Sequence, residues 1–288
     1  MSWILKINNL FRLKVTAAVG FSTAAGYLLF DEPVTGALPL SMLGVFLLAC
    51  GASGLNQVQE ARIDARMERT RNRPIPAGQL DRVTAGFLAG LFILAGLYCL
   101  ARLDRHLPAL LGLAAFALLW YNGVYTYLKR FTPFAVLPGA LVGAVPPLIG
   151  WSAAGGIISD PAIVLLAGFG FLWQIPHFWL LLLIYGPQYQ SAGLPSLERY
   201  FTSIQARRIA ALWISAVAVT GFWLGLWYSL GAGYLLVLLI LAWALIWRSR
   251  LLLPGTVADI PLIRRIFVRL NLFALAILVI IIAHQVAR

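Results

Sequence analysis

Residues 56–76 read NQVQEARIDARMERTRNRPIP and hold the densest cluster of charge in the chain, directly after a long apolar segment. Asn56, Glu60 and Asp64 are four residues apart in succession. On a helix, a step of four residues turns the side chain by only about 40°, so the three side chains share one face. Carboxylate and amide oxygens suit Mg²⁺, which often shares its ligands with substrate phosphates. The spacing therefore predicts a magnesium site on one helix.

Arginines crowd the same stretch and follow the three oxygen side chains: Arg62, Arg66, Arg69, Arg71 and Arg73. A guanidinium group can bind two phosphate oxygens at once. A metal site beside such groups at a membrane edge predicts a binding site for a lipid diphosphate. The alternative is an amphipathic juxtamembrane helix whose charges face only water and anionic lipid.

The composition of the chain excludes a soluble domain. Of its 288 residues, 61% are hydrophobic and only 11% are charged. Apolar stretches long enough to cross a bilayer recur along the whole chain, which predicts an all-α, polytopic membrane protein with one domain, 1–288. The net charge of +12 is better explained by membrane topology than by nucleic acid binding. Cys50 and Cys99 lie in apolar segments and are expected to pack in the core.

The hydropathy pattern predicts nine transmembrane helices. The expected segments are 15–33, 37–58, 83–101, 107–127, 133–153, 162–185, 209–230, 232–248 and 266–286. The fifth segment contains Pro138, Pro146 and Pro147, and a kinked helix is expected there.

Positive charge is distributed unevenly between the loops. Alternate assignment leaves only Arg102, Arg105 and Arg288 on one side, and the remaining basic clusters fall on the other. The positive-inside rule then predicts a cytoplasmic N-terminus and a C-terminus on the outer side of the cell membrane. The polar motifs all fall on the cytoplasmic side, which favours one active-site mouth there.

A second cluster lies at the end of the fourth segment, where Tyr125 and Lys129 are one helical turn apart and Arg130 follows. The cations could bind a diphosphate while the tyrosine donates a hydrogen bond. The alternative is an interfacial aromatic residue with snorkelling cations.

In the sixth segment, His177 is polar at membrane depth and could orient an acceptor such as haem, or it could be a packing residue.

Longer strings match a known family in order. The Asn56, Glu60 and Asp64 pattern is followed in step by Met67, Arg69-Thr70 and Arg73-Pro74. YTYLKRFTP occupies 125–133, GAVPPLIGW 143–151, WQIPHFW 173–179 and AGLP 192–195. On these strings the chain resembles, over nearly its whole length, the UbiA superfamily of intramembrane prenyltransferases. Within it, the chain is most similar to the protohaem IX farnesyltransferases (haem O synthases).

Three positions depart from the family pattern. Glu60 replaces the first aspartate of the first motif, and Ala135 replaces an asparagine. Gln188 replaces the aspartate expected in the second acidic motif, and Pro187 precedes it in place of another acid. A glutamine offers a carbonyl oxygen without charge. A second Mg²⁺ would be poorly neutralised there, unless Glu198 approaches from the same loop.

The resemblance implies transfer of a farnesyl group from farnesyl diphosphate to a vinyl group of haem B, which gives haem O. It implies Mg²⁺ at Asn56, Glu60 and Asp64, with Lys129 as a further catalytic residue. Diphosphate would be bound by Arg69, Arg73, Tyr125, Lys129 and Arg130. His177 is the candidate acceptor-binding residue, and haem–copper oxidase assembly proteins are possible partners.

Two alternatives remain open at this point. One is prenyl transfer to another acceptor, a quinone precursor or a chlorin. The other is a non-catalytic relative that binds haem or lipid, an alternative that Gln188 keeps open.

Overall fold

The computed structural model describes residues 3–30, 33–103, 106–253 and 259–287, and within these ranges it is helical without a strand. The helices of the first half are α1 (Trp3–Phe11), α2 (Leu13–Leu28), α3 (Ala37–Asp64), α4 (Arg82–Ala101), α5 (Leu107–Leu118), the π-helix η1 (Leu119–Tyr125), α6 (Thr126–Leu128), η2 (Pro133–Ala135), α7 (Val136–Ala140), η3 (Leu141–Ala144) and α8 (Val145–Ala154). Those of the second half are α9 (Pro161–Ser191), η4 (Leu197–Arg199), α10 (Ser203–Trp227), α11 (Ala232–Ser249), η5 (Arg250–Leu252) and α12 (Ile260–Val286).

The membrane-spanning character of the chain is confirmed. The described residues contain eight helical stretches long and apolar enough to cross a bilayer. The helix α2, with 16 residues, is shorter than these. The count of nine spans and their orientation therefore stay predictions, and Arg105 and Arg288 lie outside the described residues.

Several helices continue beyond their predicted apolar segments. The helix α3 ends at Asp64 instead of residue 58, and α9 ends at Ser191 instead of 185. Both extensions are polar, because hydropathy marks only the part of a helix that lies in lipid. The first segment differs most, since α2 ends at Leu28 and a separate helix, α1, precedes it.

The fifth predicted segment is interrupted as its prolines indicate. The 3₁₀ turn η3 separates α7 from α8, and Pro146 and Pro147 lie in the first turn of α8. A proline is tolerated there because its missing N–H would be unpaired at a helix start. The interrupted stretch packs against α9, which contacts both α7 and η3.

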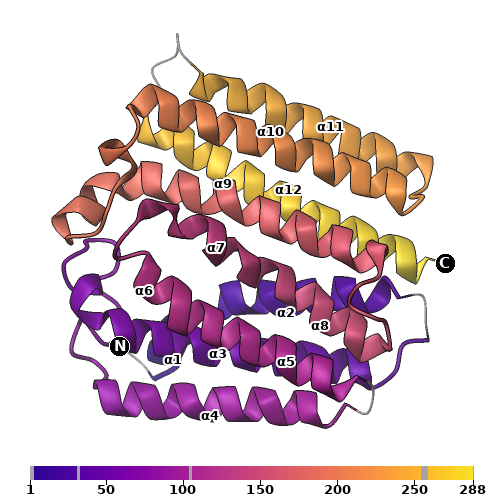
Figure 1. The fold of residues 1–288 in the computed structure, drawn as a ribbon, viewed down its shortest axis with the longest axis horizontal. Helices are drawn as coiled ribbons and strands as arrows, with labels where there is room; N and C mark the ends of the chain where they lie inside the picture. The colour runs from indigo at the N-terminus through magenta and orange to yellow at the C-terminus, as the bar shows by residue number, and fades with distance from the viewer. Residues whose placement is uncertain (1–2, 31–32, 104–105, 254–258, 288) are drawn as a thin grey trace.

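The helices pack in a closed order around the bundle (Figure 1). The helix α3 packs on α4 and α2, α9 packs on α8, α10 and α12, and α12 returns to contact α2. The backbones of α2 and α8 approach each other closely. A Cβ atom on Gly26 would collide with the carbonyl of Pro147, and one on Gly150 with the carbonyl of Thr23. Small residues permit this backbone contact, as is common between membrane helices.

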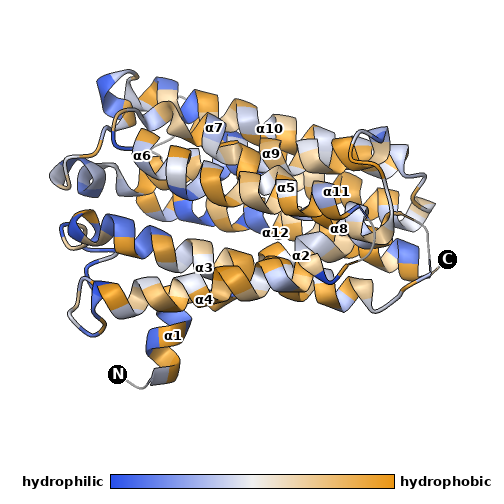
Figure 2. Ribbon diagram, turned by 60° about the horizontal axis from the view of Figure 1, so that its bottom comes forward, coloured by the Kyte–Doolittle hydropathy of each residue, from blue (hydrophilic) through white to orange (hydrophobic). Residues whose placement is uncertain are grey.

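Hydropathy divides the bundle along its length (Figure 2). Apolar residues cover the middle, where large side chains such as Leu94, Leu239 and Trp243 are exposed as expected against lipid. Hydrophilic residues gather at the end where α3 stops and α6 lies. That end brings the two predicted polar clusters together.

Candidate active site

The three oxygen side chains of α3 are buried at the polar end of the bundle. Asn56, Glu60 and Asp64 are 2%, 5% and 4% exposed. After Asp64 the chain turns back over the helix end, and Thr70 Oγ1 donates a hydrogen bond to the Asp64 carbonyl at 2.9 Å. The interpretation of a helix whose charges face only water and lipid is therefore wrong for these carboxylates.

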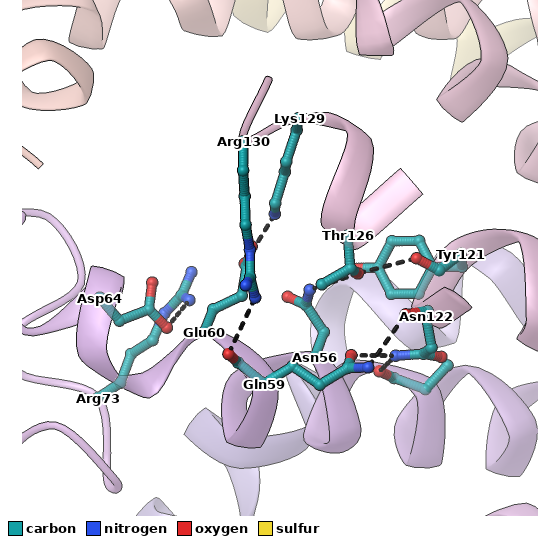
Figure 3. A network of polar contacts seen from close by, with 11 residues as sticks. Asn56, Gln59, Glu60, Asp64, Arg73, Tyr121, Asn122, Thr126, Lys129 and Arg130 are labelled. Atoms are coloured by element: carbon teal, nitrogen blue, oxygen red, sulfur yellow. Dashed lines mark hydrogen bonds and ion pairs between the residues drawn. The ribbon is translucent and has the colours of Figure 1, made fainter. Parts of the chain in front are cut away.

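Each buried carboxylate is paired with a cation from another segment (Figure 3). Arg73 Nη1 lies 2.6 Å from Asp64 Oδ2, and Lys129 Nζ lies 2.7 Å from Glu60 Oε2. A buried charge is costly unless it is paired in this way. The structure thus brings the two predicted clusters, residues 56–76 and 125–130, into one site.

Burial also acts on the cations. It lowers the pKa of Lys129, and the carboxylate of Glu60 opposes that change. Burial lowers the pKa of Arg73 as well, and the next contribution is the positive charge of Arg12. Several cations held close to two carboxylates form an arrangement that an additional polyanion would stabilise.

The positive charge of Arg12 acts on both Arg73 and Lys129. From the sequence, Arg12 was counted only toward membrane topology. It occupies the break between α1 and α2 with a φ of 51°. Gln57 fixes this break, since its Nε2 donates to the carbonyls of Asn9 and Leu10, both at 2.8 Å. The sequence gives no signal for this contact, because Gln57 and the break at Arg12 lie far apart in the chain.

The oxygen donors fit a divalent cation. Glu60 Oε1 is buried without a hydrogen-bond partner. Asn56 gives its amide nitrogen to Thr126 Oγ1 at 3.0 Å, which leaves the amide oxygen for another ligand. Two carboxylates and an amide oxygen are ligands that Mg²⁺ accepts. Across the described residues, no group of three or more acidic, histidine or cysteine side chains forms a further metal cluster.

Gln188 contacts the turn that follows α3. Its Oε1 accepts a hydrogen bond from the backbone N–H of Arg69 at 3.1 Å, and the Arg69 guanidinium lies 4.8 Å from the centre of the Tyr185 ring. These contacts attach the turn after α3 to the end of α9. Glu198 is exposed and accepts a hydrogen bond from Gln190 Nε2 at 2.7 Å, so in this structure it forms a contact of its own.

Arg130 and Tyr125 line the other side of the site. Arg130 Nη2 donates to the carbonyl of Gln59 at 3.2 Å, which ties α6 to α3. The ring of Tyr125 lies 5.8 Å from that of Phe178 and 5.2 Å from Lys129 Nζ. Tyr125, Lys129 and Phe178 line one hollow together with Tyr189. The hollow reaches from Lys129 to the aromatic side chains of α9.

His177 lies beside Phe178 on α9 and contacts α12. Its Nδ1 is 2.8 Å from Asn271 Oδ1, and Asn271 Nδ2 donates to the carbonyl of Phe267 at 2.7 Å. Because the Asn271 oxygen can only accept, Nδ1 of His177 carries the proton and Nε2 keeps its lone pair. Asn271 was not anticipated from the sequence, since one asparagine within an apolar helix gives no spacing signal.

Known proteins resemble this chain over most of its length. A model described as the UbiA prenyltransferase family matches residues 15–283. The chain belongs to the UbiA prenyltransferase family. A protoheme IX farnesyltransferase of Geobacter sulfurreducens is 42% identical over 211 residues, which are 73% of this chain and 77% of that protein. One of a Synechococcus strain is 34% identical over 248 residues, 84% of this chain and 73% of the other.

Solved structures share this fold. A UbiA homologue from Aeropyrum pernix matches with a TM-score of 0.75 and 20% identity, over 96% of this chain and 98% of that one. A UbiA homologue from Archaeoglobus fulgidus, bound to GPP and Mg²⁺, matches with a TM-score of 0.63 and 13% identity, over 96% and 99%. The UbiA architecture predicted from the sequence motifs is therefore confirmed.

Proposed function

We propose that this UbiA family member is a Mg²⁺-dependent protohaem IX farnesyltransferase, which converts farnesyl diphosphate and haem B into haem O. One observation supports this most strongly. The two buried carboxylates of α3, Glu60 and Asp64, are each paired with a cation from another segment, and Glu60 Oε1 is buried without a hydrogen-bond partner. Relatives that are 34% to 43% identical over most of the chain carry that name.

The residues of the polar end would bind the diphosphate. Asn56, Glu60 and Asp64 would hold Mg²⁺, which supplies charge neutralisation for the leaving diphosphate. Lys129 and Arg73 are paired with these carboxylates in the structure. With Mg²⁺ held by the carboxylates, both cations would be available to the diphosphate oxygens and would stabilise the charge that develops there.

Other candidates would act at the rim of the same site. Arg69 would approach the diphosphate from the turn after α3, and Tyr125 would donate from its phenol group. Arg130 would contribute its guanidinium, whose Nε is buried without a partner. Arg12 joins them as a further positive charge.

The proposed transfer replaces the diphosphate on the farnesyl group with a carbon of haem B. The bond between C1 of the farnesyl group and oxygen breaks, and the diphosphate leaves with the electron pair. The vinyl π electrons of haem B form the new carbon–carbon bond. Water then adds to the resulting cation, loses a proton and leaves the hydroxyl group of haem O. Aromatic rings around the hollow, such as Tyr125, Phe178 and Tyr189, would exclude water from the first cation.

His177 would bind the acceptor. Its Nε2 lone pair, fixed through Asn271, is suited to the iron of a haem. The ring stands beside Trp173 and Phe267, with centroids at 5.1 and 4.8 Å, against which a flat porphyrin could pack. This favours haem B over a quinone precursor as acceptor.

The setting in the cell is part of the proposal. The single domain would lie in the cell membrane with its polar end, N-terminus included, at the cytoplasm and its C-terminus outside. Haem–copper oxidase assembly proteins are its proposed partners.

The direct test is the product formed by the purified protein. Incubation with farnesyl diphosphate, haem B and Mg²⁺ should yield haem O by mass spectrometry. Prenylation of a different acceptor with no haem O would contradict the proposed acceptor. Binding of haem B without any turnover would contradict an enzyme.

A further inference from the structure

Thr126 lies between the π-helix η1 and the metal-binding face of α3. It is fully buried. Its Oγ1 donates a hydrogen bond to the carbonyl of Tyr121 at 2.8 Å, and the same oxygen accepts one from Asn56 Nδ2 at 3.0 Å. These two bonds form a chain from the π-helix to Asn56, which Figure 3 shows.

The direction of this chain is fixed by the number of protons available. A threonine hydroxyl donates one hydrogen bond only. The proton of Thr126 is used on Tyr121, whose carbonyl also accepts the backbone N–H of Thr126 at the end of η1. Toward Asn56 the hydroxyl oxygen can therefore only accept, and it must meet the amide nitrogen.

The orientation of the Asn56 amide group follows. With its nitrogen on Thr126, the amide oxygen turns toward Glu60, as Figure 3 shows. A rotated amide would point N–H donors at the cation and would set its oxygen against the lone pairs of Thr126. Only the observed orientation offers an oxygen to a metal ion.

The π-helix is itself held in place by α3. Asn122 Nδ2 donates to the carbonyl of Ala52 at 3.0 Å and to Gln59 Oε1 at 3.2 Å, and Gln59 Nε2 donates back to the Asn122 carbonyl at 3.0 Å. π-Helical turns often lie at functional sites, because they shift the side chains that follow. Here the turn brings Thr126 into hydrogen-bond distance of Asn56.

We infer that Thr126 is a positioning residue for the metal site: it fixes the carboxamide of Asn56 with the oxygen toward Mg²⁺. The inference rests on the proposed function, in which Asn56 is a metal ligand. Thr126 does not touch the metal or the substrate, and it acts only through Asn56.

The first test measures Mn²⁺ binding to the full-length protein in detergent, by electron paramagnetic resonance, without substrates. Thr126→Val keeps the shape of the side chain and removes the hydroxyl, and should weaken Mn²⁺ binding about 10- to 100-fold, as loss of an outer-shell partner does. Thr126→Ser keeps the hydroxyl and should bind within about twofold of the wild type. Thr126→Ala replaces the valine variant if that variant does not fold.

A second background separates orientation from packing. In Asn56→Asp, a carboxylate presents an oxygen in either orientation, so adding Thr126→Val should change Mn²⁺ binding by less than about threefold. An equal loss in both backgrounds would show that Thr126 only packs the helices, and would overturn the inference.

The same titrations distinguish a failure of the inference from a failure of the proposed function. If Asn56→Ala weakens Mn²⁺ binding and Thr126→Val does not, the inference alone is wrong. If Asn56→Ala leaves Mn²⁺ binding unchanged, the metal site of the proposed function is wrong, and the inference is overturned with it.

Discussion

The ammonium group of Lys129 lies 2.7 Å from Glu60 Oε2, and this contact joins two residues that are 69 positions apart in the chain. It closes the polar end of the bundle between α3 and the end of α6. Both side chains are largely buried, so the pair is held where water screens it poorly. Its strength depends on the lysine remaining charged.

We therefore predict a loss of activity at alkaline pH that reports on Lys129. Burial holds the pKa of Lys129 below its ordinary value. The cation is the low-pH form, so diphosphate binding is complete below the lowered pKa and falls as the pH rises through it. The alkaline limb of kcat/KM should thus lie below about 10.4, the usual lysine pKa. Lys129→Arg should move it upward, because arginine stays charged. An unmoved limb would exclude Lys129 as its origin.

The second prediction concerns the magnesium ligands. Asp64→Ala should abolish Mg²⁺-dependent turnover, because it removes a carboxylate from the proposed metal site and leaves Arg73 without its partner. Glu68→Ala is the matched control, since Glu68 is a nearby exposed carboxylate and should keep full activity. The measurement is haem O formation over a Mg²⁺ titration. Turnover that survives in Asp64→Ala would show that α3 does not hold the metal.

The residues on α3 could be predicted because the information is local. The period of 3.6 residues places Asn56, Glu60 and Asp64 on one face whatever surrounds them. Glu68 follows Asp64 by four residues and so fits the same spacing in the sequence. Because α3 ends at Asp64, Glu68 does not share its helical face. The apolar segments could also be predicted locally, because bilayer thickness sets their length.

The partners of these residues could not be predicted, because each depends on the tertiary fold. Nothing in the sequence spacing indicates that Arg73 pairs with Asp64 whereas Arg69 turns to Tyr185. The neutral Gln188 was noted only as a missing charge, and the structure shows it as the acceptor for the Arg69 N–H. A hydrogen bond to a backbone group leaves no pattern in a sequence.

The third prediction separates acceptor binding from metal binding. His177→Ala should weaken haem B binding at least tenfold and shift the Soret band, because a proposed iron ligand is lost. Mn²⁺ affinity should stay unchanged, since the contacts of His177 are with α9 and α12. His106→Ala serves as the control, as that exposed histidine bonds to the Gly155 carbonyl instead. An identical Soret spectrum in His177→Ala would place the haem elsewhere.

The fourth prediction concerns Arg12, which lies at the break between α1 and α2. Its charge lowers the pKa values of Arg73 and Lys129, so it lies within electrostatic reach of both. These cations repel one another, and a bound diphosphate attracts each of them and outweighs that repulsion. Arg12→Gln should therefore weaken pyrophosphate binding about tenfold in the presence of Mg²⁺. Lys14→Gln removes an exposed cation two residues away and should have little effect. Calorimetry measures pyrophosphate binding by both variants at low and at high salt. If both variants lose the same affinity and the loss disappears at high salt, it reflects general surface charge. That result would contradict a position of Arg12 in the site.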